Sequence, residues 1–109
     1  MNDLNTTDEL NILLQKIKER PGLYLGCKSL INLRTFINGF LYAMHIASGK
    51  EYIGFYDGFQ DWIANRYQIK SPHSWNSIIS FYSVDESAAF DRFYELLNEF
   101  LQEQQNTKD

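Results

Sequence analysis

The sequence predicts an all-α fold, an irregular orthogonal bundle of about five helices. Apolar residues recur at helical spacing in successive segments, and residues that favour helix starts precede these segments. Neither the alternating pattern of a strand nor a hairpin turn signal is strong anywhere along the chain. The predicted loops are short, and short loops favour packing between neighbouring helices.

The first helix is predicted to begin at the capping-box spacing of Thr6 and Glu9. Its apolar residues lie at i, i+3, i+4 and i+7, a spacing that places them on one face of a helix. The helix is expected to end at Arg20, because Pro21 disfavours helical backbone angles in the residue before it. The predicted core face consists of Leu10, Leu13, Leu14 and Ile17.

The second helix is predicted between Ser29, a favourable N-cap residue, and Gly49, a favourable C-terminal stop. Gly39 lies in the interior of this helix, where glycine costs about 1 kcal/mol relative to alanine. We therefore expect another helix to cross closely at Gly39. The predicted apolar face consists of Leu33, Phe36, Ile37, Phe40, Leu41 and Met44.

The third helix is expected to begin at Asp57, whose side chain can cap it, and to carry Phe59, Trp62 and Ile63 on its apolar face. The run before it, residues 52–56, fits either a short strand or an early helical turn, and we favour the helical turn.

The last two helices each follow a start signal. Ser71 precedes Pro72, which is the arrangement of an N-cap before a proline in the first helical position. Ser83 and Glu86 have capping-box spacing, and they precede a helix expected to fray after about Glu103. The predicted apolar residues are Trp75, Ile78, Ile79 and Tyr82 in the fourth helix and Ala89, Phe90, Phe93, Leu97, Phe100 and Leu101 in the fifth.

The 109 residues suit a single helical domain, ordered from about residue 6 to residue 103 and followed by a polar tail over residues 104–109. Lys and Arg number 10 against 14 Asp and Glu, so the net charge is −4. An acidic chain without a basic run is a poor candidate for binding nucleic acid and a better candidate for meeting a basic protein surface. No apolar run approaches membrane-spanning length, and the first nine residues are unlike a secretory signal. We therefore predict a cytoplasmic protein with no membrane or nucleic-acid partner.

The residue types give little support to catalysis. Cys27 is the only cysteine, which excludes an internal disulfide and a zinc site built from several thiolates. His45 and His73 lie in no recognised metal spacing, and we interpret His45 as a core or boundary residue and His73 as a solvated one. A Cys–His pair is formally possible, but a buried structural cysteine is the ordinary case. The sequence predicts a protein that is not an enzyme and has no cofactor or metal site.

A dense set of turn residues interrupts the helical pattern over residues 19–26. Pro21 fixes its own φ, and the two glycines of the segment permit backbone angles that other residues avoid. The residues between the glycines are large and apolar, so we expect a loop pinned to the core, with an interface as the alternative. The loop contains Arg20, Pro21, Gly22, Leu23, Tyr24, Leu25 and Gly26.

Four carboxylates recur at i, i+4 spacing along the last predicted helix, and we call them the acidic ridge. A solvated helix face is the simpler interpretation of this pattern, and a surface for a basic partner is the functional one. The acidic ridge consists of Asp91, Glu95, Glu99 and Glu103.

The aromatic content is high for so small a domain, with eight Phe, seven Tyr and two Trp. Because a small bundle cannot enclose them all, we expect part of the aromatic cluster in the middle of the chain to be exposed. Exposed Tyr and Trp beside carboxylates are typical anchors of protein interfaces, although they also commonly join a core to the wet surface. The candidate anchors and their acidic neighbours are Tyr56, Asp57, Asp61, Trp62 and Tyr67.

Five further features accompany the Arg-Pro-Gly-Leu-Tyr-Leu-Gly loop at residues 20–26. They are Ser29-Leu30, the Phe-x-x-Gly-Phe of residues 36–40, the Gly-Phe-x-x-Trp-Ile of residues 58–63, the Ser-Trp-x-x-Ile-Ile of residues 74–79, and a final helix rich in Phe and Glu over residues 90–100. Over about residues 10–101 the chain resembles a group of small bacterial immunity-type proteins that have an Arg-Pro-x-Met/Leu-Tyr-Leu-Gly loop. Leu23 stands where that group more commonly has methionine.

The resemblance implies an immunity protein of a contact-dependent growth-inhibition or polymorphic toxin system. Such a protein binds and neutralises a cognate toxin domain by occluding its active site or its substrate surface. A nuclease is one toxin class that fits, because a nuclease presents a basic cleft that carboxylates can cover. The alternative is a non-catalytic regulatory adaptor or a small-ligand binding domain with a pocket near Tyr24, Trp62 and Trp75.

Overall fold

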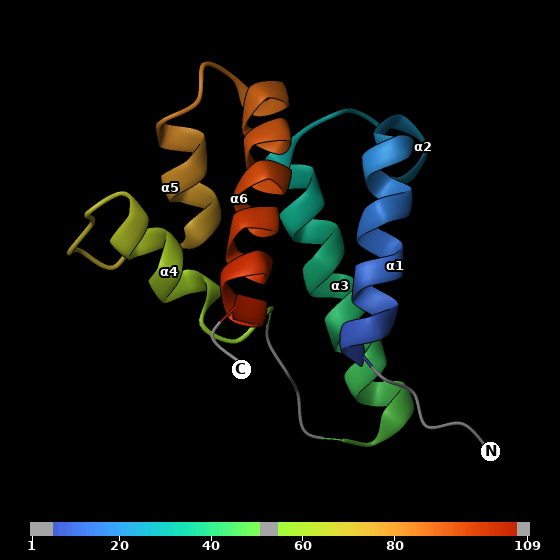
Figure 1. The fold of residues 1–109 in the computed structure, drawn as a ribbon. Coiled ribbons are helices and arrows are strands. Elements are labelled where there is room, and N and C mark those ends of the chain that lie inside the picture. The colour runs from blue at the N-terminus through green and yellow to red at the C-terminus, as the bar shows by residue number, and fades with distance from the viewer. Residues whose placement is uncertain (1–5, 51–54, 107–109) are drawn as a thin grey trace.

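The structure is a computed structural model that describes residues 6–50 and 55–106 (Figure 1). Within these ranges it contains helices and no strand, so the predicted all-α class is confirmed. A short helix within the loop after the first helix adds to the five helices that the sequence predicts. The helices are α1 (Thr6–Glu19), α2 (Pro21–Leu25), α3 (Leu30–Ser48), α4 (Phe59–Arg66), α5 (Trp75–Phe81) and α6 (Glu86–Asn106).

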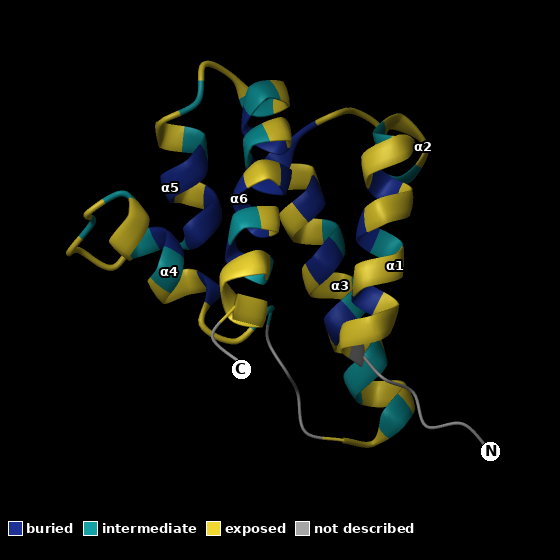
Figure 2. Ribbon diagram, in the orientation of Figure 1, coloured by how far each residue is buried: buried dark blue, intermediate teal, exposed yellow. Residues whose placement is uncertain are grey.

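Helix α6 is the central element of the bundle. It contacts α3, α4 and α5, and Figure 1 shows it between α5 and α3. Helices α1 and α2 lie on the other side of α3 from α5 in this view, and α4 crosses beside the end of α5. The buried residues in Figure 2 lie on the faces that the helices turn toward one another, so the core fills the space between them.

Aromatic side chains from three helices form the densest part of the core. The Phe59 and Phe93 rings, both fully buried, meet edge to face with their centroids 6.0 Å apart. Trp75 lies 5.2 Å from Phe93, and Phe100 lies 5.3 Å from Phe59. Edge-to-face and offset contacts of this kind stabilise aromatic pairs beyond the area that they bury. This cluster holds α4, α5 and α6 together.

The predicted apolar faces of α1, α3 and α6 are largely confirmed. Their buried members are Leu10, Leu14 and Ile17 in α1, Leu33, Ile37 and Leu41 in α3, and Ala89, Phe90, Phe93, Leu97 and Phe100 in α6. The structure adds Tyr94 and Leu96 to the buried face of α6. The Tyr94 hydroxyl donates a hydrogen bond to the Leu14 carbonyl oxygen at 2.7 Å, which ties α6 to α1.

The predicted ends of α3 are confirmed. The Ser29 side chain accepts a hydrogen bond from the Asn32 backbone N–H at 3.2 Å, and this satisfies an amide that has no partner within the helix. Gly49 ends the helix with a φ of 68°, in the left-handed region that glycine adopts without strain.

Two other helix starts differ from the predictions. Helix α4 begins at Phe59 after Gly58, whose φ is 85°, so Asp57 does not cap it. Helix α5 begins at Trp75 after Ser74, so the Ser71-Pro72 pair lies in the preceding connection. A start signal in sequence shows that a turn is allowed, whereas packing of the apolar residues decides where the turn becomes a helix.

The start of α6 is also displaced from its predicted cap. The Asp85 carboxylate accepts a hydrogen bond from the Ala88 N–H at 2.8 Å, whereas the Ser83 hydroxyl donates to the Ile79 carbonyl at the end of α5. Tyr82, expected in the core, follows the last residue of α5 and is exposed. At its other end α6 continues past Glu103 to Asn106.

Two further expectations concern α3 and the segment that follows it. Gly39 is exposed, and a methyl group added to it would have no heavy atom of another element within 4 Å, so the expected close crossing is absent from the described residues. Residues 51–54 lie outside the described ranges, so only the end of the run at 52–56 can be compared. Phe55 and Tyr56 lie in a bend and not in a helical turn.

Glu86 connects three helices. Its Oε1 atom accepts a hydrogen bond from the Ile31 backbone N–H at 2.7 Å, and its Oε2 atom accepts one from the Ser80 hydroxyl at 2.7 Å. A carboxylate at the N-terminus of α3 satisfies an amide without an intrahelical partner and complements the helix dipole. Glu86 therefore holds the starts of α3 and α6 and the end of α5 in one place.

Replacement of Phe59 by alanine should lower the free energy of unfolding by about 3–5 kcal/mol, because it leaves a cavity among three helices. Phe81, which is 79% exposed, is the matched control, and its replacement by alanine should change stability by less than about 0.5 kcal/mol. Urea denaturation followed by circular dichroism measures both. Equal losses in the two variants would contradict this view of the core.

Replacement of Glu86 by alanine should lower the free energy of unfolding by about 2 kcal/mol, because hydrogen bonds to a charged group from two helices are lost. Glu95 lies in the same helix, but its carboxylate is exposed and pairs only with Arg92 among the contacts described. Its replacement by alanine should cost no more than about 0.5 kcal/mol. Thermal unfolding of the two variants side by side tests the difference.

Candidate functional site

The first half of the acidic ridge is paired with cations of the same chain. Asp91 Oδ2 lies 2.8 Å from Lys28 Nζ, and Glu95 Oε1 lies 2.8 Å from an Arg92 guanidinium nitrogen. The two acidic side chains nevertheless remain 59% and 63% exposed. Exposed ion pairs contribute little to stability, at most about 1 kcal/mol each, so these carboxylates can exchange partners readily.

The second half of the acidic ridge faces α4. Glu99 lies 3.5 Å from the Arg66 Nε atom, and Glu103 accepts a hydrogen bond from the Trp62 indole N–H at 3.0 Å. Each four-residue step along a helix adds about 40° of rotation, so Asp91 and Glu103 point about 120° apart around α6. The ridge is therefore not a single surface: its first half borders the α2–α3 connection and its second half borders α4.

Two of the predicted aromatic anchors join the core to the surface. Trp62 is half-buried and stacks on Phe59, with the ring centroids 6.3 Å apart and the planes 15° from parallel. Tyr56 is half-buried, and its hydroxyl donates a hydrogen bond to the Asn11 side-chain oxygen. Burial raises the pKa of Tyr56 to about 12, because the ionised phenolate would lose its hydration. The acidic neighbours of these anchors, Asp57 and Asp61, are exposed.

Tyr67, the third predicted anchor, belongs to an aromatic group at the surface. Its ring stacks on Tyr82 with a centroid distance of 4.9 Å and an angle of 16°, and Phe81 meets Tyr82 edge-on at 5.0 Å. Phe81, the last residue of α5, is 79% exposed, and Val84, in the connection to α6, is 89% exposed. We call Phe81, Tyr82 and Val84 the α5–α6 corner. Sequence reasoning did not single it out, although an apolar run past a helix end and before the cap Asp85 is a signal that could have found it.

The α5–α6 corner lies between two surface depressions. A shallow hollow of about 340 Å³ joins it to the first half of the acidic ridge, since Tyr82 and Val84 line this hollow together with Asp91, Arg92 and Glu95. A groove of about 360 Å³ on the other side of Tyr82 is lined mainly by apolar residues of α5 and of the segment before it. The structure thus brings exposed apolar groups and two carboxylates together at one end of α6.

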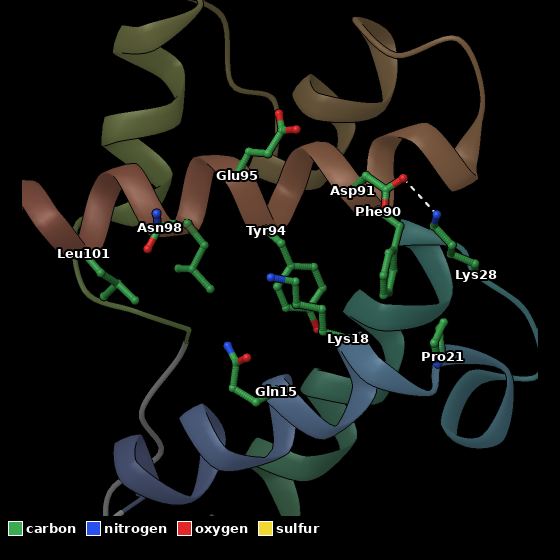
Figure 3. Close-up of a pocket in the computed structure, with 11 residues that line it drawn as sticks. Gln15, Lys18, Pro21, Lys28, Phe90, Asp91, Tyr94, Glu95, Asn98 and Leu101 are labelled. Atoms are coloured by element: carbon green, nitrogen blue, oxygen red, sulfur yellow. Dashed lines mark hydrogen bonds and ion pairs between the residues drawn. The ribbon is translucent and has the colours of Figure 1, made fainter.

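A larger cleft separates α1 from α6 (Figure 3). Its volume is about 980 Å³, and its apolar lining includes Phe90, Tyr94 and Leu97 of α6. Lys18 of α1 lies over the Tyr94 ring, with its ammonium nitrogen 5.7 Å from the ring centroid, and Figure 3 shows the Lys28–Asp91 ion pair at one end. Burial raises the pKa of the Tyr94 phenol, and the nearby Tyr56 raises it further.

The Arg-Pro-Gly loop is a connector that forms a helix. Pro21 begins α2 and lines the α1–α6 cleft, while Gly26 ends α2 with a φ of 82°. Tyr24 packs edge-on against Phe36 of α3, with a centroid distance of 6.4 Å. Leu23, expected in the core, is exposed, because consecutive helical residues point about 100° apart and Tyr24 takes the direction that faces α3. The loop residues Arg20 and Gly22 are also exposed.

The candidate catalytic residues do not meet. Cys27 is exposed and not buried as expected, and its sulfur accepts a hydrogen bond from the Asn32 side chain at 3.2 Å. The His45 Nδ1 atom lies 2.6 Å from the Lys50 carbonyl oxygen, whereas His73 is exposed in the connection before α5. In the described part of the chain, no group of three or more His, Cys, Asp or Glu residues is arranged to hold a metal ion. None of the helices in the described ranges combines the length and apolar character that a membrane crossing requires.

Comparison with known proteins finds no matching family model, no matching curated protein and no matching solved structure.

Alkaline titration should reveal the buried position of Tyr56. Its pKa is higher in the folded chain than the ordinary value of 10, so its contribution to stability is fully present below pH 10 and is lost as the pH rises toward 12. In ultraviolet absorbance, Tyr56→Phe should remove a tyrosinate step near pH 12 and should reduce the loss of stability between pH 10 and 12. A variant that instead lacks a tyrosinate step near pH 10 would show that Tyr56 is solvated.

Proposed function

We propose that this chain is an immunity protein that binds and neutralises a bacterial toxin domain, and that the α5–α6 corner is its main contact. The observation that carries the proposal is the exposure of Tyr82 and Val84 beside the carboxylates of Asp91 and Glu95, with the exposed Phe81 ring packed against Tyr82. An exposed apolar centre with a charged rim is the anatomy of a protein interface. The loop and helix motifs that resemble immunity-type proteins support the choice of a toxin as the partner.

The charge of the site favours a basic partner surface. The whole chain carries a net charge of −4, so its field attracts cationic partners during encounter. Asp91 and Glu95 lie at the rim of the hollow, where a partner Lys or Arg could replace Lys28 or Arg92 at little cost. A nuclease toxin presents such a surface around its phosphate-binding cleft, and this binding mode covers that cleft.

Co-expression tests the function directly. The C-terminal domain of the protein encoded immediately upstream is expressed alone and together with this chain. Growth arrest by that domain, relieved by this chain with a co-purifying complex, is the expected result. An upstream domain that is toxic but neither bound nor relieved by this chain would overturn the proposal, as would one that is not toxic.

Substitution of Phe81 by lysine should weaken the complex by at least about 30-fold, because it places a cation at an apolar contact that faces a basic surface. Leu23→Lys is the matched control: Leu23 is an exposed apolar residue in α2, at the other side of the bundle in Figure 1. Isothermal titration calorimetry with the toxin domain measures both affinities. Loss of binding in Leu23→Lys alone would move the interface to the Arg-Pro-Gly loop.

Reversal of Asp91 and Glu95 to lysine should slow association with the toxin by about tenfold at low salt, because local attraction steers the encounter. The double variant Asp57→Lys, Asp61→Lys changes the net charge by the same amount at exposed positions near α4. Stopped-flow mixing should show a smaller effect for this control. Equal slowing in both variants would mean that overall charge, and not this rim, governs association.

A small-ligand binding function is the second candidate, and the α1–α6 cleft favours it. Its volume of about 980 Å³ is at the upper end for ligand pockets, and it combines an aromatic lining with the ammonium groups of Lys18 and Lys28. A co-purifying small molecule found by mass spectrometry, released by Lys18→Glu, would support this function.

A further inference from the structure

The folding of a single copy does not explain an apolar groove between α1 and α3. Its volume is about 540 Å³, and its lining is mainly apolar, with Leu13, Phe36 and Phe40 among the lining residues. Ile12 of α1 stands on its edge and is 52% exposed. Figure 1 shows α1 and α3 side by side along this face. The α5–α6 corner belongs to other elements, so the groove is a separate surface.

Gly39 lies in this groove, in the interior of α3, and the single copy makes no use of its missing side chain. Its φ is not positive, and no heavy atom of another element would contact an added methyl group within 4 Å. Apart from proline, glycine is the least favourable residue in a helix interior. A glycine that no contact within the single copy requires therefore points to a contact with another molecule. A glycine at an exposed helix surface permits close approach by another backbone or side chain.

The exposed row of α3 continues beyond Gly39. Tyr42 and Ile46 follow it at i+3 and i+7, so they share one face of the helix with it, and both are exposed. Ile31, two turns before Gly39, is exposed on the same side. Large apolar side chains on both sides of an open glycine form a surface with a central recess.

The charges of α1 make this surface complementary to the same surface of a second copy. Glu9 and Lys16 both line the groove, with Ile12 near the midpoint between them. They are seven residues apart, or about 10 Å along the helix axis. A two-fold axis through the midpoint would place Glu9 of one copy opposite Lys16 of the other, and Lys16 opposite Glu9. Self-complementarity of this kind is what an isologous dimer interface requires.

We propose that the α1–α3 groove is a homodimer interface. Two copies pack these faces against each other with their α1 helices antiparallel, so that Ile12 of each copy meets Ile12 of the other near the axis and the open Gly39 positions let the two α3 helices approach. The apolar residues supply the buried centre, and the two Glu9–Lys16 pairs form the rim and set the orientation. A second copy is the occupant because the rim is negative at Glu9 and positive at Lys16, on opposite sides of the midpoint of the groove.

Sedimentation velocity over a range of protein concentrations tests the proposal, with a monomer–dimer equilibrium as the expected result. Gly39→Arg should abolish the dimer while circular dichroism shows unchanged folding, because the position is open in the single copy. Gly39→Ala is the matched control: it adds only a methyl group and should weaken the dimer far less. A wild-type chain that is monomeric at every concentration, or a dimer that survives Gly39→Arg, would overturn the proposal.

Charge reversal tests the orientation. Glu9→Lys alone and Lys16→Glu alone place like charges opposite each other twice, so each should raise the dissociation constant roughly tenfold. The doubly exchanged chain should dimerise like the wild type, and a mixture of the two single variants should form a heterodimer. A mixture that stays monomeric would exclude the antiparallel pairing.

The dimer and the toxin interface can fail separately. A dimeric chain that gives no protection would leave this inference standing and remove the proposed function. If the wild-type chain is monomeric and Gly39→Arg loses toxin binding, the groove binds the toxin and not a second copy.

Discussion

The packing of Phe59 against Phe93 is the contact on which the rest of the structure depends. These two rings belong to α4 and α6, and Trp75 of α5 completes their enclosure. Helix α4 is short, and its start at Gly58 lacks a side-chain cap, so its stability comes from this burial and not from local propensity. The position of α6 is set by the same cluster. Each candidate surface is built on α6 or includes a helix that packs beside it.

The position of α6 determines how the charges are used. Glu86 at its start meets the N-terminus of α3, and Asp91 and Glu99 meet cations from other elements. Much of the acidic character of α6 is thus balanced within the chain. The apolar groups of the α5–α6 corner remain exposed, because they lie at the end of α5 and in the connection to α6, where the core sets the directions of the two helices. This contrast is why the corner, and not the whole acidic ridge, is the centre of the proposed function.

The sequence was a good guide to periodic features and a poor one to isolated residues. The core face of α1 could be predicted because Leu10, Leu14 and Ile17 recur at helical spacing, and burial follows that spacing. Leu23 and Tyr82 are large and apolar, yet both are exposed. Leu23 lies on the outer side of the short helix α2, and Tyr82 follows the last residue of the short helix α5. The candidate site was found in part: Asp91 and Glu95 were predicted, whereas Val84 was not.

The sequence by itself determined the helical class, most of the core residues and the caps at Ser29 and Gly49, because each depends on residues near one another in the chain. Tertiary structure decided which carboxylates are paired, since Lys28 and Asp91 are 63 residues apart. It also decided that the acidic ridge divides between two surfaces, because a row at i, i+4 spacing winds around its helix and meets different neighbours. The open position of Gly39 likewise depends on where α1 lies, and no local pattern determines that.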